Sequence, residues 1–261
     1  MLVQRLISAA VGIPLIVLVI WVGDGLLAAV AGLAALIAVV EFAAARGASR
    51  TPLSVLAAVT AGALPLVALA GEEYLLGAAV AVVVLMMTAF TFTQDPRQDV
   101  QDWAWGLATA IYFGGLAAYF VLLREGGNGR DLLFFTVLTV WITDTGAYFV
   151  GRPFGRRHFA PAVSPGKTVE GSLGSWVAGL VAVFALNEAF ELGLGTEHRL
   201  ALGLLLPPVI MAGDLAESAL KRAVGVKDSS GLVPGHGGIA DRLDSLLFAA
   251  PFVYYYLKWI A

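Results

Sequence analysis

The chain has 261 residues, of which 59% are hydrophobic and only 13% charged, and its formal net charge is −3. This composition excludes an ordinary soluble domain, because apolar runs of about 20 residues, long enough to cross roughly 30 Å of hydrocarbon, recur along the whole length. The absence of cysteine excludes disulfides, thiolate nucleophiles and cysteine-ligated metals.

The apolar runs predict transmembrane helices, because none shows the residue-by-residue alternation of a barrel strand. We expect an all-α, polytopic integral membrane protein with about nine transmembrane helices. The predicted spans are Leu6–Val22, Gly25–Ala45, Leu53–Ala70, Tyr74–Phe92, Trp103–Leu123, Leu132–Val150, Gly171–Phe190, Leu200–Ala216 and Leu243–Ile260. The charged start at Arg5 is also seen in cleaved signal peptides, but the long apolar stretch and the second span directly after it favour a retained helix.

Lysine and arginine are distributed unequally over the two sides that nine spans define. One side carries Arg5, Arg46, Arg50, Arg97, Arg152, Arg156, Arg157, Lys167, Lys221, Arg222, Lys227 and Arg242. The other side carries Arg124, Arg130, Arg199 and Lys258. The positive-inside rule places the richer side in the cytoplasm, so we expect a multi-pass protein of the cell (inner) membrane with its active site facing the cytoplasm.

The distribution of polar residues divides the chain near residue 123. Residues 1–123 are predicted to form an amino-terminal transmembrane scaffold, and residues 124–261 a catalytic transmembrane region with two cytosolic motif loops, 152–170 and 218–242. Glu41 is the one charged residue well inside a span of the scaffold, and we expect it to reach water beside Arg46 at the cytosolic end.

Asp144 lies inside a predicted span, about 10 Å from its cytosolic end. A carboxylate at that depth is costly and is by default functional. The alternative is an aspartate paired with a nearby arginine for packing alone.

The loop at 152–170 combines three arginines with a run that reads Ser-Pro-Gly-Lys-Thr from Ser164 to Thr168. A P-loop would need glycine where the chain has Pro161, and a preceding strand, so that motif is rejected. Backbone N–H groups and Lys167 at a helix start suit a phosphate. Anchoring beside anionic headgroups is the alternative role for the arginines.

The end of the eighth span carries one polar stripe on an otherwise apolar helix. The stripe comprises Asp214, Glu217, Ser218 and Lys221. Spacings of three, four and seven residues place these side chains on one helix face. Carboxylates can hold a hard divalent ion and cations can neutralise phosphate oxygens, so the stripe suits a metal–triphosphate complex. A plain Glu217–Lys221 ion pair is the alternative.

Asp241 and Asp244 lie where the ninth span begins. The helix macrodipole alone favours acids there, by about 0.3–1 kcal/mol each. Gly237 and Gly238 would let the backbone approach a ligand closely. The neighbouring His236 could bind phosphate, bind metal or order the loop, and the residues alone leave these alternatives open.

The segment from Ser218 to Asp244 resembles the signature of the phosphatidate cytidylyltransferases, the CDP-diacylglycerol synthases. It reads Ser-Ala-Leu-Lys-Arg at 218–222, Lys-Asp at 227–228 and Pro-Gly-His-Gly-Gly-Ile-Ala-Asp-Arg-Leu-Asp at 234–244. Segments 144–148, 164–171 and 213–218, and the opening at 4–7, are similar to further blocks of that family. One departure is Gly166, where the family commonly has a second lysine.

The resemblance implies an enzyme of phospholipid biosynthesis that transfers the cytidylyl group of CTP to phosphatidic acid, giving CDP-diacylglycerol and pyrophosphate. It implies a Mg²⁺-dependent nucleotidyltransferase, with a second cation left open. Asp214 and Asp241 would hold the metal with Asp144 nearby, and Lys221 would complete the catalytic set. The residues expected to contact substrates are Ser164, Lys167, Thr168, Glu217, Ser218, Arg222, Lys227, Asp228, His236, Gly237, Gly238 and Arg242.

The polar faces of the sixth, eighth and ninth spans would then converge on a cytosolic-side polar cavity open to lipid. The expected partners are CTP, phosphatidic acid and the bilayer, with no nucleic acid, and a homodimer is left open.

Three other functions fit parts of the sequence. A CTP-dependent polyprenol or phytol kinase would transfer the γ-phosphate and release CDP. A CDP-archaeol synthase would run the same chemistry on an ether lipid. A secondary transporter would account for Asp144 and Asp214 inside the membrane, but no inverted repeat is visible.

Overall fold

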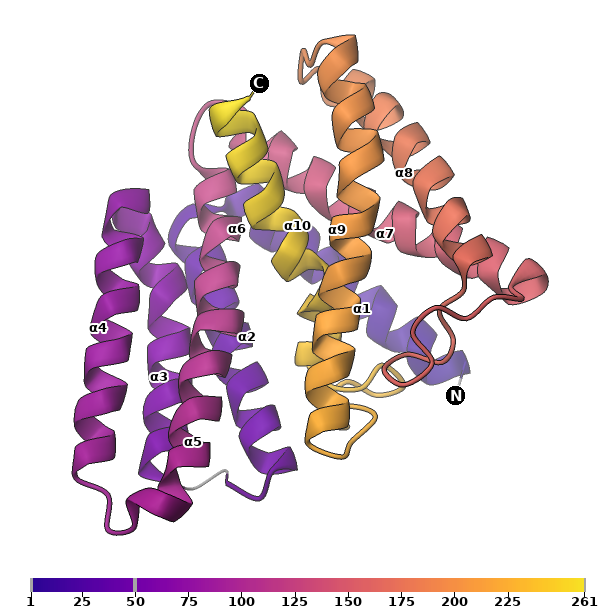
Figure 1. Ribbon diagram of the computed structural model, residues 1–261. Helices are drawn as coiled ribbons and strands as arrows, with labels where there is room; N and C mark the ends of the chain where they lie inside the picture. The colour runs from indigo at the N-terminus through magenta and orange to yellow at the C-terminus, as the bar shows by residue number, and fades with distance from the viewer. Residues whose placement is uncertain (1, 49–50, 261) are drawn as a thin grey trace. The chain divides into compact units, whose positions relative to one another are not determined.

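The computed structural model describes residues 2–48 and 51–260, with side chains from residue 6 onward. Arg50 and the Arg5 side chain, both counted in the charge asymmetry, lie outside this description. Most of the described residues lie in helices, and none of them lies in a strand (Figure 1). The helices are α1 (Leu2–Val22), α2 (Asp24–Ala45), α3 (Pro52–Val67), α4 (Glu72–Thr91), α5 (Pro96–Thr109), α6 (Leu116–Arg124), α7 (Gly129–Phe154), α8 (Val169–Ala189), α9 (Thr196–Ala223) and α10 (Ala240–Trp259). The all-α class is confirmed.

Seven helical segments of the described chain are long and apolar enough to cross a membrane. They are Asp24–Ala45, Pro52–Ala70, Glu72–Thr91, Pro96–Arg124, Gly129–Phe154, Val169–Ala189 and Thr196–Ala223, and they correspond to the second to eighth predicted spans. The first predicted span is a shorter apolar helix, Leu6–Val22. The ninth lies in α10, which is outside the seven and carries four charged residues. A polytopic membrane protein is therefore supported, while the count of nine stays a prediction.

The chain folds as two compact units. The first comprises Met1–Glu125 and Ala223–Leu243, and the second comprises Gly126–Arg222 and Asp244–Ala261. The predicted division at residues 123 and 124 was one of function, and as such it stays a prediction.

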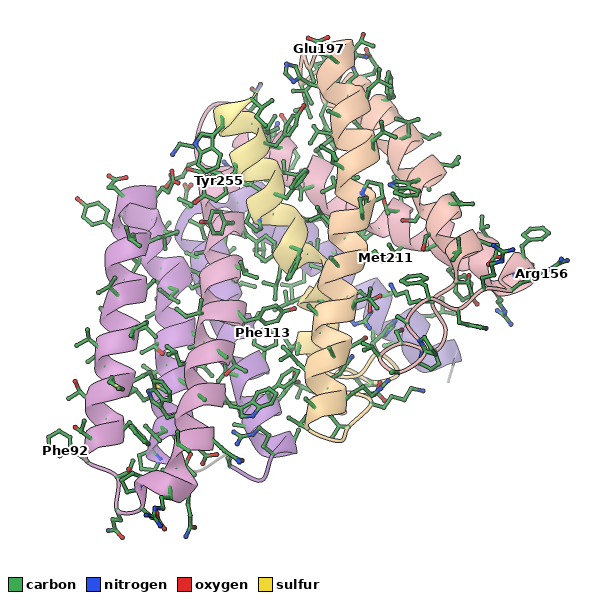
Figure 2. All side chains as sticks on the ribbon, viewed as in Figure 1. Phe92, Phe113, Arg156, Glu197, Met211 and Tyr255 are labelled. Atoms are coloured by element: carbon green, nitrogen blue, oxygen red, sulfur yellow. The ribbon has the colours of Figure 1, made fainter. Side chains whose placement is uncertain are left out.

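The first unit is built on helices α2 to α6, and side-chain caps fix the starts of α3 and α5. Thr51 and Asp95 accept hydrogen bonds from the amides of Ser54 and Arg97, and each is followed by proline at the first helical position. Between α5 and α6 the helix widens into the π-helical segment η2 (Ala110–Gly115). Phe113 of this segment is fully buried and packs against Phe42, with ring centroids 5.4 Å apart (Figure 2).

The second unit is built on α7 to α9 and most of α10. Phe135, Val183, Leu202 and Tyr256, one residue from each helix, form its buried core. Small residues bring α7 and α8 together, because a Cβ atom at Gly174 would collide with Val150. This close contact leads directly into the loop between α7 and α8, which holds several predicted site residues.

Candidate active site

Helix α9 carries the predicted polar stripe in its last three turns. The helix runs through Ala223 and α10 begins at Ala240, so the predicted loop 218–242 is helical at both ends and the connecting segment is 224–239. A Cβ atom at Gly213 would lie 2.7 Å from the carbonyl oxygen of Asp244, so glycine lets α9 pack closely on the part of α10 that follows Leu243, within the second unit. The stripe begins at the next residue, Asp214.

Asp214 is paired with a lysine from the preceding motif loop. Its Oδ2 forms an ion pair with Lys167 Nζ, and both side chains are about three quarters buried. Its Oδ1 accepts a hydrogen bond from Ser218 Oγ at 3.3 Å, one turn further along α9. The structure therefore brings together three predicted site residues that come from two segments.

Glu217 and Lys221 form a second ion pair on the same helix. Their Oε2 and Nζ atoms are 2.6 Å apart, and the side chains are 0% and 10% exposed. The i, i+4 pair predicted as an alternative is present, but it is buried rather than solvated. Removing either partner would leave the other charge buried and unpaired, so this pair holds the lysine in place on α9.

The loop between α7 and α8 ends in a helix cap. Helix α7 continues through Phe154, beyond the predicted end at Val150, so the loop itself is shorter than 152–170. The buried Thr168 hydroxyl accepts a hydrogen bond from Gly171 N at 3.1 Å and thereby caps α8. Its side chain is enclosed by glycines, since a Cβ atom at Gly155 would lie 2.8 Å from it.

Glu170 holds the other side of this loop. Its Oε2 accepts hydrogen bonds from the backbone amides of Arg156 and Arg157, at 2.9 and 3.2 Å. The Arg156 side chain projects at the outer end of the loop (Figure 2). Thr168 and Glu170 thus order the loop that presents Lys167, and a direct contact of Thr168 with substrate stays a prediction.

Asp241 lies at the start of α10, in the first unit, and is buried. Its Oδ2 accepts hydrogen bonds from Ser229 N at 2.9 Å, Ser229 Oγ at 2.8 Å and Gly238 N at 2.8 Å. Gly237 has φ of 80°, and a Cβ atom there would lie 2.5 Å from the same oxygen. The two glycines of the motif therefore bring backbone close to this carboxylate, a reason that does not require a substrate.

Glu41 is the residue that sequence reasoning placed wrongly. It is buried, 6% exposed, and accepts hydrogen bonds from Ser229, Ser230, Ile239 and Ala240 rather than reaching water. The Arg46 guanidinium pairs with Asp102 at 3.0 Å instead. The available signal was a carboxylate inside an apolar span, which by default has a function.

The remaining predicted residues are more exposed. Asp144 is exposed on α7, and Arg222, Lys227, Asp228 and Arg242 are exposed at the ends of the 224–239 segment. Ser164 and His236 are partly buried, and both take part in backbone turns: Ser164 O accepts from Lys167 N, and His236 N donates to Val233 O. Arg222, Lys227 and Arg242 therefore place positive charge at the surface of this region.

The oxygen ligands needed for Mg²⁺ are present, although in separate groups. Within residues 2–48 and 51–260 no three histidines or acids cluster as a metal site. Mg²⁺ is usually held by one or two carboxylates together with substrate phosphates, so Asp214 or Asp241 with their hydroxyl neighbours are a fitting donor set. Because Asp214 belongs to the second unit and Asp241 to the first, the shared metal site and the polar cavity stay predictions.

Comparison with known proteins supplies the family. The chain is 44% identical over 175 residues to the phosphatidate cytidylyltransferase of Bacillus subtilis. The aligned segment covers 67% of this chain and 65% of that protein. It is 35% identical to the enzyme of the same name from Staphylococcus haemolyticus over 64% of each chain, and 44% identical to that from Haemophilus influenzae over 51% of this chain and 48% of the other. The matched segment thus spans just under two thirds of the first of these relatives.

The profile of the cytidylyltransferase family matches residues 3–260, almost the whole sequence. Its coverage includes both motif loops and the helices that carry Asp144, Asp214 and Asp241. The chain belongs to the cytidylyltransferase family.

Proposed function

We propose that this chain transfers the cytidylyl group of CTP to phosphatidic acid and releases pyrophosphate, in a Mg²⁺-dependent reaction. The observation that carries the proposal is the contact between Lys167 and Asp214, which joins a phosphate-suited loop to the acidic stripe of α9. The relatives named phosphatidate cytidylyltransferase support the choice of acceptor.

The acceptor can act as its own nucleophile. A phosphomonoester has a second pKa of about 6, so the phosphate of phosphatidic acid is mostly dianionic at neutral pH. One of its oxygens forms a bond to the α-phosphorus of CTP, and the bond from that phosphorus to the oxygen bridging to the β-phosphate breaks. Pyrophosphate leaves with the electron pair, so atoms and charge balance without a serine or histidine nucleophile.

The protein then has to align two anions and neutralise their charge. The chemistry that Mg²⁺ supplies when bound is further neutralisation of phosphate oxygens, and Asp214 and Asp241 are the residues that would hold it. Lys167 and Lys221 have one ammonium group each beside a carboxylate, and exposed Arg222 and Lys227 add positive charge nearby in sequence. We assign these cations to the triphosphate and the lipid phosphate.

The membrane setting fits a lipid acceptor. Seven apolar helices would keep the acyl chains in the bilayer, and the excess of lysine and arginine on one predicted side supports a site that faces the cytoplasm, where CTP is found. We therefore place the protein in the cytoplasmic membrane with the two motif loops inside.

The experiment is an assay of the purified protein in detergent with phosphatidic acid, Mg²⁺ and CTP labelled on the α-phosphate. Label in the lipid fraction with equimolar pyrophosphate is the expected result. Release of CDP with a polyprenol acceptor, and no label in lipid, would contradict the proposal in favour of a kinase. An ether-lipid acceptor used in preference to phosphatidic acid would point to archaeol chemistry, and no turnover with any acceptor would favour transport.

A further inference from the structure

We propose that Glu41 is a positioning residue: from α2 it anchors the segment 229–240 and so fixes the place of Asp241. Its catalytic consequence rests on the proposed function, whereas the anchoring itself does not. All the residues concerned belong to the first unit.

Each oxygen of the Glu41 carboxylate lies within hydrogen-bonding distance of two donor groups, one of which, the Ser229 hydroxyl, shares its single proton between Glu41 and Asp241. Oε1 lies 2.6 Å from Ser230 Oγ and 3.0 Å from Ile239 N. Oε2 lies 3.0 Å from Ser229 Oγ and 3.0 Å from Ala240 N. Two donors per oxygen match the acceptor capacity of a carboxylate, so the group is well satisfied although it is buried.

The same donors lead to Asp241. Ser229 Oγ, which faces Glu41, is also 2.8 Å from Asp241 Oδ2, and the Ser229 amide donates to that oxygen at 2.9 Å. Ile239 and Ala240 are the two residues before Asp241, and their amides belong to the start of α10. Holding these two amides sets the position and direction of the helix start, and with it the aspartate.

Gly238 shows that the segment is shaped around the carboxylate. A Cβ atom at this position would lie 2.5 Å from Glu41 Oε2 and would collide with Ser229 Oγ. Only glycine allows the backbone to pass that close.

A role in packing alone would not require this charge. Among the described residues Glu41 has no ion pair, and its four donors are neutral. A buried charge of this kind is usually no more stabilising than an apolar residue of similar volume. The placement of four donors around one carboxylate therefore points to a requirement for a fixed loop geometry.

The test is Glu41→Gln in the full-length protein, because an amide replaces one acceptor oxygen by an NH₂ group that faces N–H and O–H donors. We expect hydrogen–deuterium exchange of residues 229–241 to rise by at least about 10-fold. We expect kcat to fall about 10- to 100-fold while KM for CTP changes less than about 3-fold, since the positioning acts on turnover. Asp24→Asn, an exposed carboxylate on the same helix, is the matched control and should leave both measurements unchanged.

Ser230→Ala is the milder second variant, used if Glu41→Gln does not yield folded protein. It removes one donor, and the change in exchange should have the same sign and location but be smaller. Glu41→Asp keeps the negative charge on a shorter side chain. Its turnover should therefore lie between that of the wild type and that of Glu41→Gln.

Exchange that is unchanged in 229–241, or that rises equally across α3 to α6, would overturn the proposal, because the effect would then be absent or a general loss of packing. Faster exchange confined to the segment with unchanged kcat would overturn the catalytic part. If the wild type transfers no cytidylyl group, the proposed function fails, and the exchange experiment alone then decides the anchor.

Discussion

The acidic side chains of the two units have different hydrogen-bond and ion-pair partners. In the first, Glu41 and Asp241 are surrounded by backbone amides and serine hydroxyls. In the second, Asp214 and Glu217 are each paired with a lysine. Neutral donors fixed in the backbone can only form a permanent frame, whereas an ammonium group on a flexible stem can exchange a carboxylate for a phosphate. The difference suggests a rigid part and a part that responds to substrate.

The largest expected effect is the loss of turnover in Asp214→Asn and Asp241→Asn. Each change removes a charge proposed to hold Mg²⁺ beside the triphosphate, so we expect kcat to fall by about 10³-fold or more. Both variants should remain folded in detergent, as judged by size-exclusion chromatography. Near-normal turnover in either variant would mean that the residue does not hold the metal. The contrast between the acids of the two units would then have no catalytic meaning at that residue.

A large effect is also expected for Gly238→Ala, which tests the rigid frame. The added methyl group would collide with the Glu41 carboxylate and Ser229, so we expect turnover to fall about 10- to 100-fold with faster exchange in the segment. Gly231→Ala is the control in the same segment, because a Cβ atom there meets nothing within 4 Å. Equal activity of the two variants would mean that the frame is adaptable.

Lys221→Met tests whether the buried lysine serves stability, catalysis or both. Breaking a buried ion pair by removing one partner costs about 3–5 kcal/mol, so the melting temperature in detergent should fall clearly. The double variant Glu217→Leu/Lys221→Met removes both charges and should regain most of the stability. If the double variant also regains turnover, Lys221 has a structural role only. Its ion pair would then be part of a permanent frame, like the hydrogen bonds of the first unit.

The smallest effect is expected at Glu125, which belongs to neither cluster. Partial burial, with Glu73 nearby, raises the pKa of the Glu125 carboxyl above its ordinary value. The folded state therefore binds this proton more tightly than the unfolded state, and stability falls as pH rises through the raised pKa. Glu125→Gln should flatten that fall without affecting turnover, as measured by thermal unfolding over a pH series.

Much of the fold follows from hydropathy. Segments as long and apolar as Leu53–Ala70 have few alternatives to a spanning helix, and the seven long apolar helical segments of the described chain are of this kind. Hydropathy predicts α10 less clearly, because Asp241, Asp244 and Lys258 lower its mean hydropathy. It also could not predict the π-helical turn of η2, in which Gly114 lies so close to Ala61 that an added Cβ atom would collide with the Ala61 backbone.

The candidate site was predictable where its spacing is helical and hidden where its contacts are long-range. The stripe from Asp214 to Lys221 could be derived from a period of 3.6 residues, and the structure retains it as one helix. The partners of Glu41 lie 188 to 199 residues further along the chain, and nothing in its local sequence indicates them. The sequence predicts that Gly237 and Gly238 approach a ligand, which stays a prediction; in the structure they approach Asp241 and Glu41.

The long separation between Glu41 and its donors has a consequence for biosynthesis. A chain that enters the membrane from its amino terminus inserts α2 when the segment 229–240 has not yet been translated. Until then the carboxylate lacks these donors, and an unpaired charge is costly in hydrocarbon. The anchored start of α10 can form only after residues 229–240 have emerged. Before that segment has emerged, the nascent polypeptide has no anchored Asp241, on which the proposed activity depends.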